Sequence, residues 1–354
     1  MGFYYEKVIR PILFKQDPEA AHDLGLTALD YLGKLGPLCR IMERHNAPRR
    51  AEPIKLWGLS FPNAVGLAAG MDKNGRIWRA APALGFGFVE IGTVTFHKQS
   101  GNDRPRVFRY PEHGAILNRM GFNNEGAEAV AERLKGSMGK KRGSMPIGIN
   151  LGKSKVTPLG EAAADYLGSF HLLADYADYF AINVSSPNTP DLRKLQGSDY
   201  LPELLGELVK ANRGRARKLG GQPKPLLLKI APDLSFREID AIVQTIFDSE
   251  LDGIIATNTT VTRSGPMSRV QEAGGVSGRP LHRRACEVVN YISRSTGGRL
   301  PIIGVGGIDS PETAGRMVDA GAALVQIYSG MIYKGPFLAK QIAQALAPRH
   351  QGWV

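Results

Sequence analysis

From about residue 60 onward, hydrophobic residues gather in short uninterrupted runs, and each run is followed by a stretch with helical spacing. The runs are apolar or β-branched and do not alternate with polar residues, which is typical of strands buried on both faces. They are Ala64–Ala69, Phe88–Gly92, Ile147–Leu151, Phe180–Val184, Leu226–Ile230, Gly253–Thr257, Ile302–Val305 and Leu324–Tyr328. The clearest helical stretches are Asn123–Lys135, Glu161–Ala174, Ser235–Phe247 and Pro311–Ala320.

Eight strand–helix units predict an α/β fold, a (β/α)8 TIM barrel. Ser235 and Ser310 are expected helix N-caps, and Glu238 completes a capping box with Ser235. A doubly wound sheet is the alternative, but eight regular units without a glycine-rich loop after the first strand argue against it. The long excursion His97–Gly121 follows the second strand, so we expect it to build or cover the active site.

Residues 1–50 precede the barrel and are expected to form a small helical extension, with the barrel occupying 51–354. Tyr5, Val8, Ile9, Ile12 and Leu13 share one helical face, and Pro11 should kink or shorten that helix. Asp17-Pro18-Glu19 is a strong start for a second helix, which Gly33, Gly36 and Pro37 should close. The apolar face of this hairpin either packs on the barrel or forms a membrane-surface anchor or a channel for a lipid-like ligand.

Composition narrows the function classes only moderately. The chain has 354 residues, of which 43% are hydrophobic, so it can bury a sizeable core. A net charge of +12 favours an anionic partner: nucleic acid, anionic lipid or a phosphorylated cofactor. Cys39 and Cys286 have no metal or redox spacing, and the seven histidines form no HxH or HExxH pattern, so we expect no metal and a reducing cytoplasm. No apolar run of 18 residues and no secretory signal is present.

Polar residues or glycines lie at the end of every predicted strand or shortly after it, and in a barrel those positions meet at one end. They are Lys73, Thr93, Asn150, Asn183, Ser186, Asn188, Lys229, Thr257, Asn258, Thr259, Gly306, Gly307, Tyr328 and Ser329. Each position alone has a structural explanation such as a capped turn. A barrel without a ligand would not need all of them together, so the convergence predicts a binding site.

Three features of these strand ends suggest the chemistry. Backbone N–H groups near Gly306-Gly307 and Ser329-Gly330 suit a phosphate, as is common at strands seven and eight of such barrels. Lys73 and Lys229 have no acid at helical spacing, so they are expected to stabilise negative charge on a reduced flavin or a substrate carboxylate.

The third feature is the scarcity of ordinary proton acceptors. Asp72 and Asp233 are the only carboxylates at these strand ends, no histidine is found there, and both aspartates are expected to cap loops. The general base is therefore expected to be a hydroxyl, and Ser186 is the candidate. Because serine is a poor base, its removal of a substrate proton must be coupled to hydride loss and needs a relay to water.

With these residues in place, the chain closely resembles the dihydroorotate dehydrogenase family. The motifs that carry the resemblance are AAGMDKNG, EIGTVT, RPRVFRY, NRMGFNN, INLGKS, INVSSPNTP, LLLKIAPD, TNTT, GGVSGRPL, IIGVGGI and QIYSGMIYKGP, in order along nearly the whole barrel. Within the family, a serine base and a helical N-terminal extension mark class 2, the membrane-associated, quinone-reducing type. Ser186 and residues 1–50 agree with both markers.

The resemblance implies particular roles for matching positions. It implies FMN held by Ala69, Gly70, Met71, Asp72, Lys73, Thr93, Asn150, Asn183, Lys229, Thr257, Gly278, Gly307, Tyr328 and Ser329. It implies dihydroorotate or orotate held by Lys73, Asn118, Arg119, Met120, Gly121, Phe122, Asn183, Asn188, Asn258 and Thr259. Ser186 would take the C5 proton while hydride leaves C6 for the flavin, and His22, Arg106 and Tyr328 would face the quinone. It further implies a monomer bound peripherally at the cytoplasmic face of a bacterial membrane.

Other functions agree less well with the sequence. A dihydrouridine synthase type of flavin barrel would suit the positive charge, but it should use a cysteine at a strand end, and neither cysteine is there. A class 1 enzyme using fumarate or NAD is opposed by Ser186 and the extension. A non-redox barrel that binds a sugar phosphate would lack flavin absorption. The extension could also be purely structural, with no membrane contact.

Overall fold

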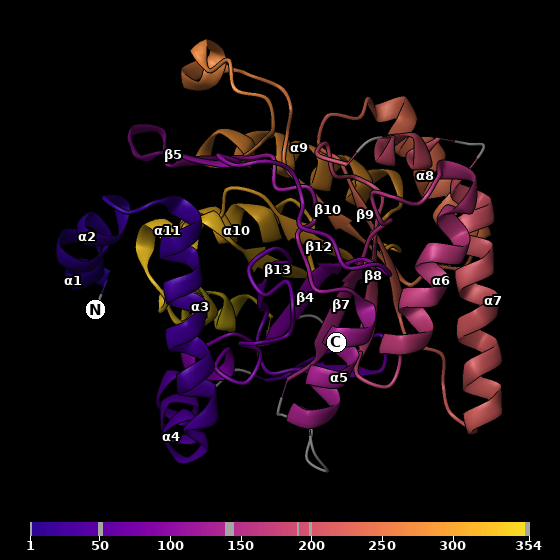
Figure 1. Cartoon of the computed structure of the whole chain (residues 1–354), viewed down its shortest axis with the longest axis horizontal. Helices are drawn as coiled ribbons and strands as arrows, with labels where there is room; N and C mark the ends of the chain where they lie inside the picture. The colour runs from indigo at the N-terminus through magenta and orange to yellow at the C-terminus, as the bar shows by residue number, and fades with distance from the viewer. Residues whose placement is uncertain (1, 49–51, 139–144, 190, 198–199, 351–354) are drawn as a thin grey trace.

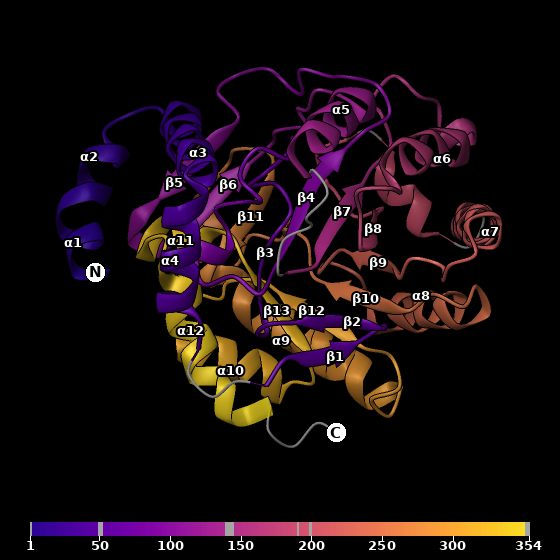
Figure 2. The ribbon, with the colours of Figure 1, turned by 90° about the horizontal axis from the view of Figure 1, so that it is seen from below.

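Eight parallel strands close into a barrel around which the rest of the chain is arranged (Figures 1 and 2). The computed structural model describes residues 2–48, 52–138, 145–189, 191–197 and 200–350. The barrel strands are β3 (Val65–Leu67), β4 (Phe88–Val94), β7 (Ile147–Leu151), β8 (Tyr179–Asn183), β9 (Leu226–Ile230), β10 (Gly253–Ala256), β12 (Ile302–Val305) and β13 (Leu324–Ile327). Each overlaps one predicted strand, so the predicted barrel is confirmed.

Helices cover the outside of the barrel and bury its apolar strands. They are α5 (Ala127–Met138), α6 (Ala162–Leu173), α7 (Leu201–Leu219), α8 (Phe236–Asp248), α9 (Arg279–Ser295), α10 (Pro311–Asp319), α11 (Ser329–Lys334) and α12 (Leu338–Leu346). The Ser235 side chain accepts from Glu238 N, and the Glu238 side chain accepts from the Ser235 backbone, which confirms the predicted capping box. Ser310 caps α10 in the same way, with Thr313 as its partner.

Two small antiparallel sheets lie outside the barrel. One is the hairpin β1 (Ile54–Leu56) and β2 (Leu59–Phe61). The other pairs β5 (Val107–Tyr110) with β6 (Ala115–Asn118), and β6 with β11 (Gly275–Gly278). The excursion after β4 therefore forms a sheet with a segment that follows β10, and this sheet carries Asn118 to the carboxyl end of the barrel strands.

The N-terminal extension contains more helix than the sequence predicted. A continuous helical stretch runs through α1 (Gly2–Tyr4), a π-helical turn (Tyr5–Ile9) and α2 (Arg10–Phe14). The wider turn precedes Pro11, which has no N–H to donate. Asp17 caps α3 (Pro18–Lys34) as expected, by accepting from the N–H groups of Glu19 and Ala20.

The predicted end of the second helix near Gly33, Gly36 and Pro37 is confirmed, since α3 ends at Lys34, but a second role of Gly36 and Pro37 was not predicted. They begin a further helix, α4 (Gly36–Asn46), because proline is tolerated in the first turn, where its missing N–H has no helical partner. The predicted boundary between residues 50 and 51 lies outside the described residues.

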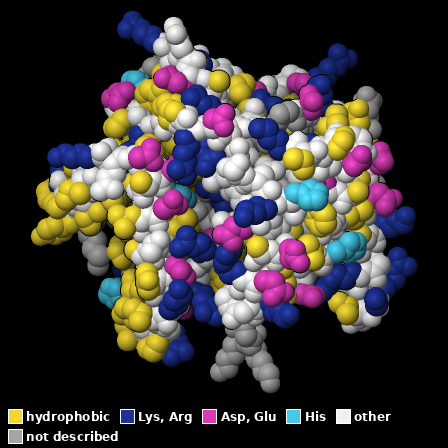
Figure 3. Space-filling view, in the orientation of Figure 1, with side chains coloured by type: hydrophobic (Ala, Val, Ile, Leu, Met, Phe, Trp, Pro, Cys, Tyr) yellow, Lys and Arg dark blue, Asp and Glu magenta, His cyan; other side chains and the backbone are white. Residues whose placement is uncertain are grey.

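The apolar side of these N-terminal helices is largely exposed. Phe3 is 70% exposed, Tyr31 65% and Ile41 66%, and Figure 3 shows hydrophobic side chains gathered at this edge of the molecule. Packing against the barrel therefore does not account for this side. Within the described residues, no helix combines the length and the apolar character needed to cross a membrane.

Candidate functional site

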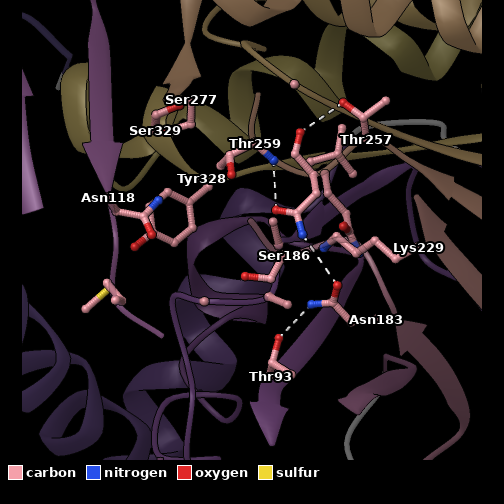
Figure 4. Close-up of a pocket in the computed structure, with 18 of the residues that line it drawn as sticks. Thr93, Asn118, Asn183, Ser186, Lys229, Thr257, Thr259, Ser277, Tyr328 and Ser329 are labelled. Atoms are coloured by element: carbon pink, nitrogen blue, oxygen red, sulfur yellow. Dashed lines mark hydrogen bonds between the residues drawn. The ribbon is translucent and has the colours of Figure 1, made fainter. Parts of the chain in front are cut away.

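A cavity of about 1030 Å³ opens at the carboxyl ends of the barrel strands. Ser186, Asn183, Lys229 and Thr257 lie on one side of it, and Asn118 and Tyr328 lie on the other (Figure 4). The sequence-predicted residues that line it are Ala69, Gly70, Lys73, Thr93, Asn118, Met120, Gly121, Phe122, Asn183, Ser186, Asn188, Lys229, Thr257, Asn258, Thr259, Gly307, Tyr328 and Ser329. Residues separated by up to 260 positions in the chain are thus brought to one space.

A chain of amide and hydroxyl groups crosses the floor of the cavity. Thr93 Oγ1 donates to Asn150 Oδ1 over 2.6 Å, and Asn183 Nδ2 donates to Thr93 Oγ1 over 3.0 Å. Asn258 Nδ2 reaches Ser185 Oγ over 3.0 Å. Because these groups hold each other, their orientation is set before a ligand arrives, and the remaining lone pairs and N–H groups have fixed directions.

Beneath this floor lies a buried carboxylate that the sequence analysis missed. Glu90 is fully buried on β4 and pairs with Lys229 on β9, with 3.2 Å between Oε1 and Nζ. Asn150 and Gln326 also donate to its two oxygens, over 2.8 and 2.7 Å. Lys229 has no acid at helical spacing, as the sequence indicated, and its acidic partner lies 139 positions away. The signal was present as a single acid within the apolar run Phe88–Gly92.

The segment after β8 holds Ser186 at the side of the cavity. Ser186 is 5% exposed, and its Oγ accepts the backbone N–H of Asn188 over 3.2 Å. The Asn188 side chain donates to Asn118 O over 3.1 Å, and Asn102 Nδ2 donates to Asn188 O over 3.1 Å. The loop that carries Ser186 is therefore tied to the excursion on the opposite side. Pro190, which ends the motif, lies outside the described residues.

Lys73 forms no ion pair with any described residue, although several charges lie near it. Burial lowers its pKa to about 8, and the nearby carboxylates of Glu19 and Asp23 oppose that shift. The ammonium is thus poised to gain from an anionic ligand. Asp72, next to it, accepts the N–H groups of Arg76 and Ile77, each over 2.8 Å, which confirms its expected role as a loop cap.

Glu19 lies on the first turn of α3. The three candidate quinone residues, His22, Arg106 and Tyr328, lie around it. Arg106 binds the Glu19 carboxylate through Nε and Nη2, with 2.9 Å for the Nη2 bond. Burial, assisted by the Glu19 charge, raises the pKa of Tyr328 to about 12. His22 lies one turn further along α3, and burial together with Lys73 and Arg76 lowers its pKa to about 3. His22 Nε2 is buried and has no partner among the described residues.

Some predicted residues support the cavity without lining it. Asn150 links Thr93 to Glu90, and Asp72 caps its loop. The Arg119 side chain donates to Pro105 O and Ala273 O, so it points away from the cavity. Gly278 lines a second, neighbouring cavity, and Met71 is buried in the core. In turn, Gln326 and Ser277 line the main cavity but were not predicted.

The lining suits a flavin with a phosphorylated tail. Its amides, hydroxyls and lysine suit a polar ring edge, Leu281 and Val305 suit an apolar ring face, and the backbone of Gly306-Gly307 and Ser329 suits a phosphate. Gln326 provides a specific indication. Its Nε2 is fixed on Glu90, and its buried Oε1 has no partner in the described part of the chain, so a ligand N–H can donate to it. The described residues contain no cluster of His, Cys, Asp or Glu that could hold a metal.

Comparison with known proteins identifies the family. The model of the dihydroorotate dehydrogenase family matches residues 53–349. The chain belongs to the dihydroorotate dehydrogenase family. A dihydroorotate dehydrogenase (quinone) of Gloeobacter violaceus is 51% identical over 97% of this chain and 94% of that protein. One from Chloroflexus aurantiacus is 49% identical over 98% of this chain and 96% of that protein.

A solved structure of a family member has a similar backbone fold. The dihydroorotate dehydrogenase of Eimeria tenella, crystallised in complex with ferulenol, has a TM-score of 0.82 and 33% identity, and the match covers 96% of this chain and 94% of that one. A share of 96% is more than the barrel alone, so the match extends beyond the barrel of this dihydroorotate dehydrogenase family member. The predicted family is therefore confirmed.

Proposed function

We propose that this chain oxidises dihydroorotate to orotate and passes the electrons to a quinone, the CH–CH oxidation that its relatives' names describe. This reaction serves de novo pyrimidine biosynthesis. Its cofactor is FMN, which when bound accepts hydride from the substrate and later gives up electrons to the quinone.

The observation that carries the mechanism is the position of Ser186. No Asp, Glu, His or Cys is found among the described residues that line the cavity. Lys229 is already paired with Glu90, and the raised pKa of Tyr328 keeps its hydroxyl protonated. Ser186 Oγ receives the Asn188 N–H, a contact that stabilises negative charge on the oxygen. Ser186 is thus the general base that removes the C5 proton, and the proton then moves on to solvent.

The substrate carboxylate and ring are held by charge and by fixed amides. The free ammonium of Lys73 supplies the positive charge. The amides of Asn118, Asn183, Asn188 and Asn258 surround the same space and can bind both N–H and C=O groups of a pyrimidine ring. Holding C5 against Ser186 in this way contributes by orientation, which is a large part of the barrier lowering in such sites.

Two observations support the cofactor assignment: Gln326 Oε1 has no partner in the part of the chain that the structure describes, and the lining of the cavity suits a flavin. Ala69, Gly70, Lys73, Thr93, Asn183, Lys229, Thr257, Gly307, Tyr328 and Ser329 would hold the FMN. Asn150 would act through Thr93 and Asn183. On the other side of Tyr328, His22, Arg106 and α3 would receive the quinone. A neutral His22 with an open Nε2 can hydrogen bond to a quinone oxygen.

Anaerobic stopped-flow absorbance tests this function. Dihydroorotate should bleach the flavin band of the purified protein, and a short-chain quinone should restore it quickly. Restoration by fumarate or NAD instead would keep the barrel chemistry and remove the quinone role. A purified protein that neither carries nor binds flavin would refute the whole assignment.

The extension is the proposed membrane contact. Its exposed apolar side chains and its basic residues Lys7, Lys15, Arg40 and Arg44 suit the surface of an anionic bilayer. The protein would bind there as a peripheral monomer at the cytoplasmic face, with the quinone entering between the bilayer and the Glu19 end of α3. Deleting residues 2–46 without any change in membrane binding or quinone turnover would rule this out.

A further inference from the structure

A second cavity of about 640 Å³ adjoins the main one and shares the wall formed by Gly307 and Ser329. Gly278 and Gly330 also line it, so it lies where the resemblance places the flavin phosphate. The N-terminal helical stretch reaches the same space, since Glu6 and Arg10 line this cavity too. No residue of the first 14 is among those implied to hold FMN.

The N-terminal segment, defined here as residues 2–14, is attached to the barrel beside this cavity. Tyr5 OH donates to Ile332 O over 2.8 Å, Arg10 Nη1 donates to Tyr333 O over 2.9 Å, and Lys334 Nζ lies 3.0 Å from Glu6 Oε2. All three contacts are to α11, whose first residues, Ser329 and Gly330, form the cavity wall. Figures 1 and 2 show the segment beside α11 and outside the barrel.

The charges in this cavity are incompletely matched. Arg279 pairs with Asp309 over 2.7 Å, and Lys334 pairs with Glu6. Arg10 Nη1 lies 3.8 Å from Glu6 Oε2, the oxygen that Lys334 already contacts. Within the described residues, its Nε and Nη2 donors have no acceptor, although the side chain is only 29% exposed. Three cations against two carboxylates leave a positive excess that suits a phosphate.

We propose that the N-terminal segment closes the phosphate end of the FMN site and that Arg10 provides a phosphate-binding charge there. The segment thereby controls how slowly FMN leaves. This inference rests on the proposed function, because it takes FMN as the cofactor. It gives the N-terminal segment a role in retaining the cofactor, in addition to the proposed membrane contact.

Flavin release and flavin selectivity test the proposal. The full-length protein loaded with FMN is diluted, and the rise of free-flavin fluorescence gives the dissociation rate. Arg10→Gln should raise that rate about tenfold, as expected for the loss of one charge-assisted contact. Apoprotein is then titrated with FMN and with riboflavin, which lacks the phosphate. Arg10→Gln should weaken FMN binding about tenfold and leave riboflavin binding unchanged.

Two further variants separate charge from closure. Lys7→Gln removes an exposed charge from the same segment outside the cavity, and it should change neither rate nor affinity. Tyr5→Ala loosens the attachment to Ile332, so it should speed release of both flavins. An unchanged FMN release rate in both Arg10→Gln and Tyr5→Ala would overturn the proposal, as would equal weakening of FMN and riboflavin by Arg10→Gln. If the wild-type chain bound neither flavin, the proposed function itself would fail.

Discussion

Ser186 illustrates how much a single side chain depends on its neighbours in this site. A serine hydroxyl is a weak base, and within the described residues the Asn188 N–H is the backbone donor to the Ser186 Oγ. The Asn188 amide is itself tied to Asn118, so the geometry of the base depends on a residue 68 positions earlier in the chain. Catalysis by serine is therefore expected to be sensitive to the exact placement of its loop.

The first prediction concerns Ser186→Ala. The variant should keep its flavin but reduce it with dihydroorotate roughly 10²–10⁴-fold more slowly, because that is the usual contribution of a general base. Stopped-flow bleaching measures this step directly. Ser235→Ala, a matched change at the N-cap of α8, should leave the bleaching rate unchanged. Flavin reduction at the wild-type rate in Ser186→Ala would assign the base elsewhere.

The second prediction concerns pH and His22. Its pKa is lowered from 6.5 to about 3 in the folded protein, chiefly by burial. Below pH 6.5 the unfolded chain takes up a proton that the folded chain refuses, so stability is lost as the pH falls. The loss should be about 1.4 kcal/mol per pH unit between pH 6 and pH 4.

Denaturant unfolding at pH 6 and at pH 4 measures this slope. His22→Gln should flatten it, whereas substitution of the exposed His171 by Gln should not. An identical slope in the wild type and in His22→Gln would show that His22 titrates normally in the folded protein.

At the scale of secondary-structure elements, the hydrogen bonds and the ion pair of Glu90 form a network that joins several strands inside the barrel. Glu90 on β4 contacts Asn150 on β7, Lys229 on β9 and Gln326 on β13. A buried ion pair is weak support for stability by itself, but removing one partner leaves an uncompensated buried charge. The network should therefore keep the strand ends in register beneath the ligand.

The third prediction concerns this pair. Lys229→Met should lower the free energy of unfolding by about 3–5 kcal/mol, because Glu90 loses its counter-charge. The double variant Lys229→Met/Glu90→Gln should recover part of that loss. Both variants lack Lys229, so any flavin contact of the lysine cancels in the comparison. If the two variants unfolded at the same urea concentration, the Glu90 charge would still be compensated in Lys229→Met.

The eight barrel strands could be predicted because burial on both faces leaves a local apolar run. The sheet β5–β6–β11 could not, because it pairs residues 107–118 with residues 275–278, and neither segment carries a local signal for the other. Glu90 was missed for a related reason, since its partner is distant in the chain. The strand-end positions of Ser186, Asn183 and Lys73 were predictable, because barrel topology alone brings strand ends together.

At the scale of the whole molecule, the N-terminal helices form an edge rich in exposed hydrophobic side chains. Hydrophobic side chains gather over the N-terminal helices, with Lys and Arg side chains around them (Figure 3). An apolar patch surrounded by positive charge is suited to an anionic bilayer, where both area and charge contribute to binding. Membrane contact and quinone entry would then share one side of the protein.

The fourth prediction tests this face. Ile41→Glu on α4 should lower partition onto anionic vesicles about tenfold or more, since Ile41 would otherwise be buried in the bilayer surface. Flotation of vesicles in a density gradient measures the bound fraction. Leu219→Glu, at the end of α7, is the matched control because Leu219 is 63% exposed on another helix. Equal loss in both variants would mean that binding is not localised to the extension.

The attachment of residues 2–14 to Ile332–Lys334 also has a consequence for synthesis. A ribosome completes the first helical turns hundreds of residues before it delivers α11. During nearly all of translation the N-terminal segment has no docking partner on α11, and its apolar side is available to chaperones or to a bilayer. The last barrel unit must be finished before the segment can dock, so the proposed membrane contact could form well before the proposed enclosure of the flavin.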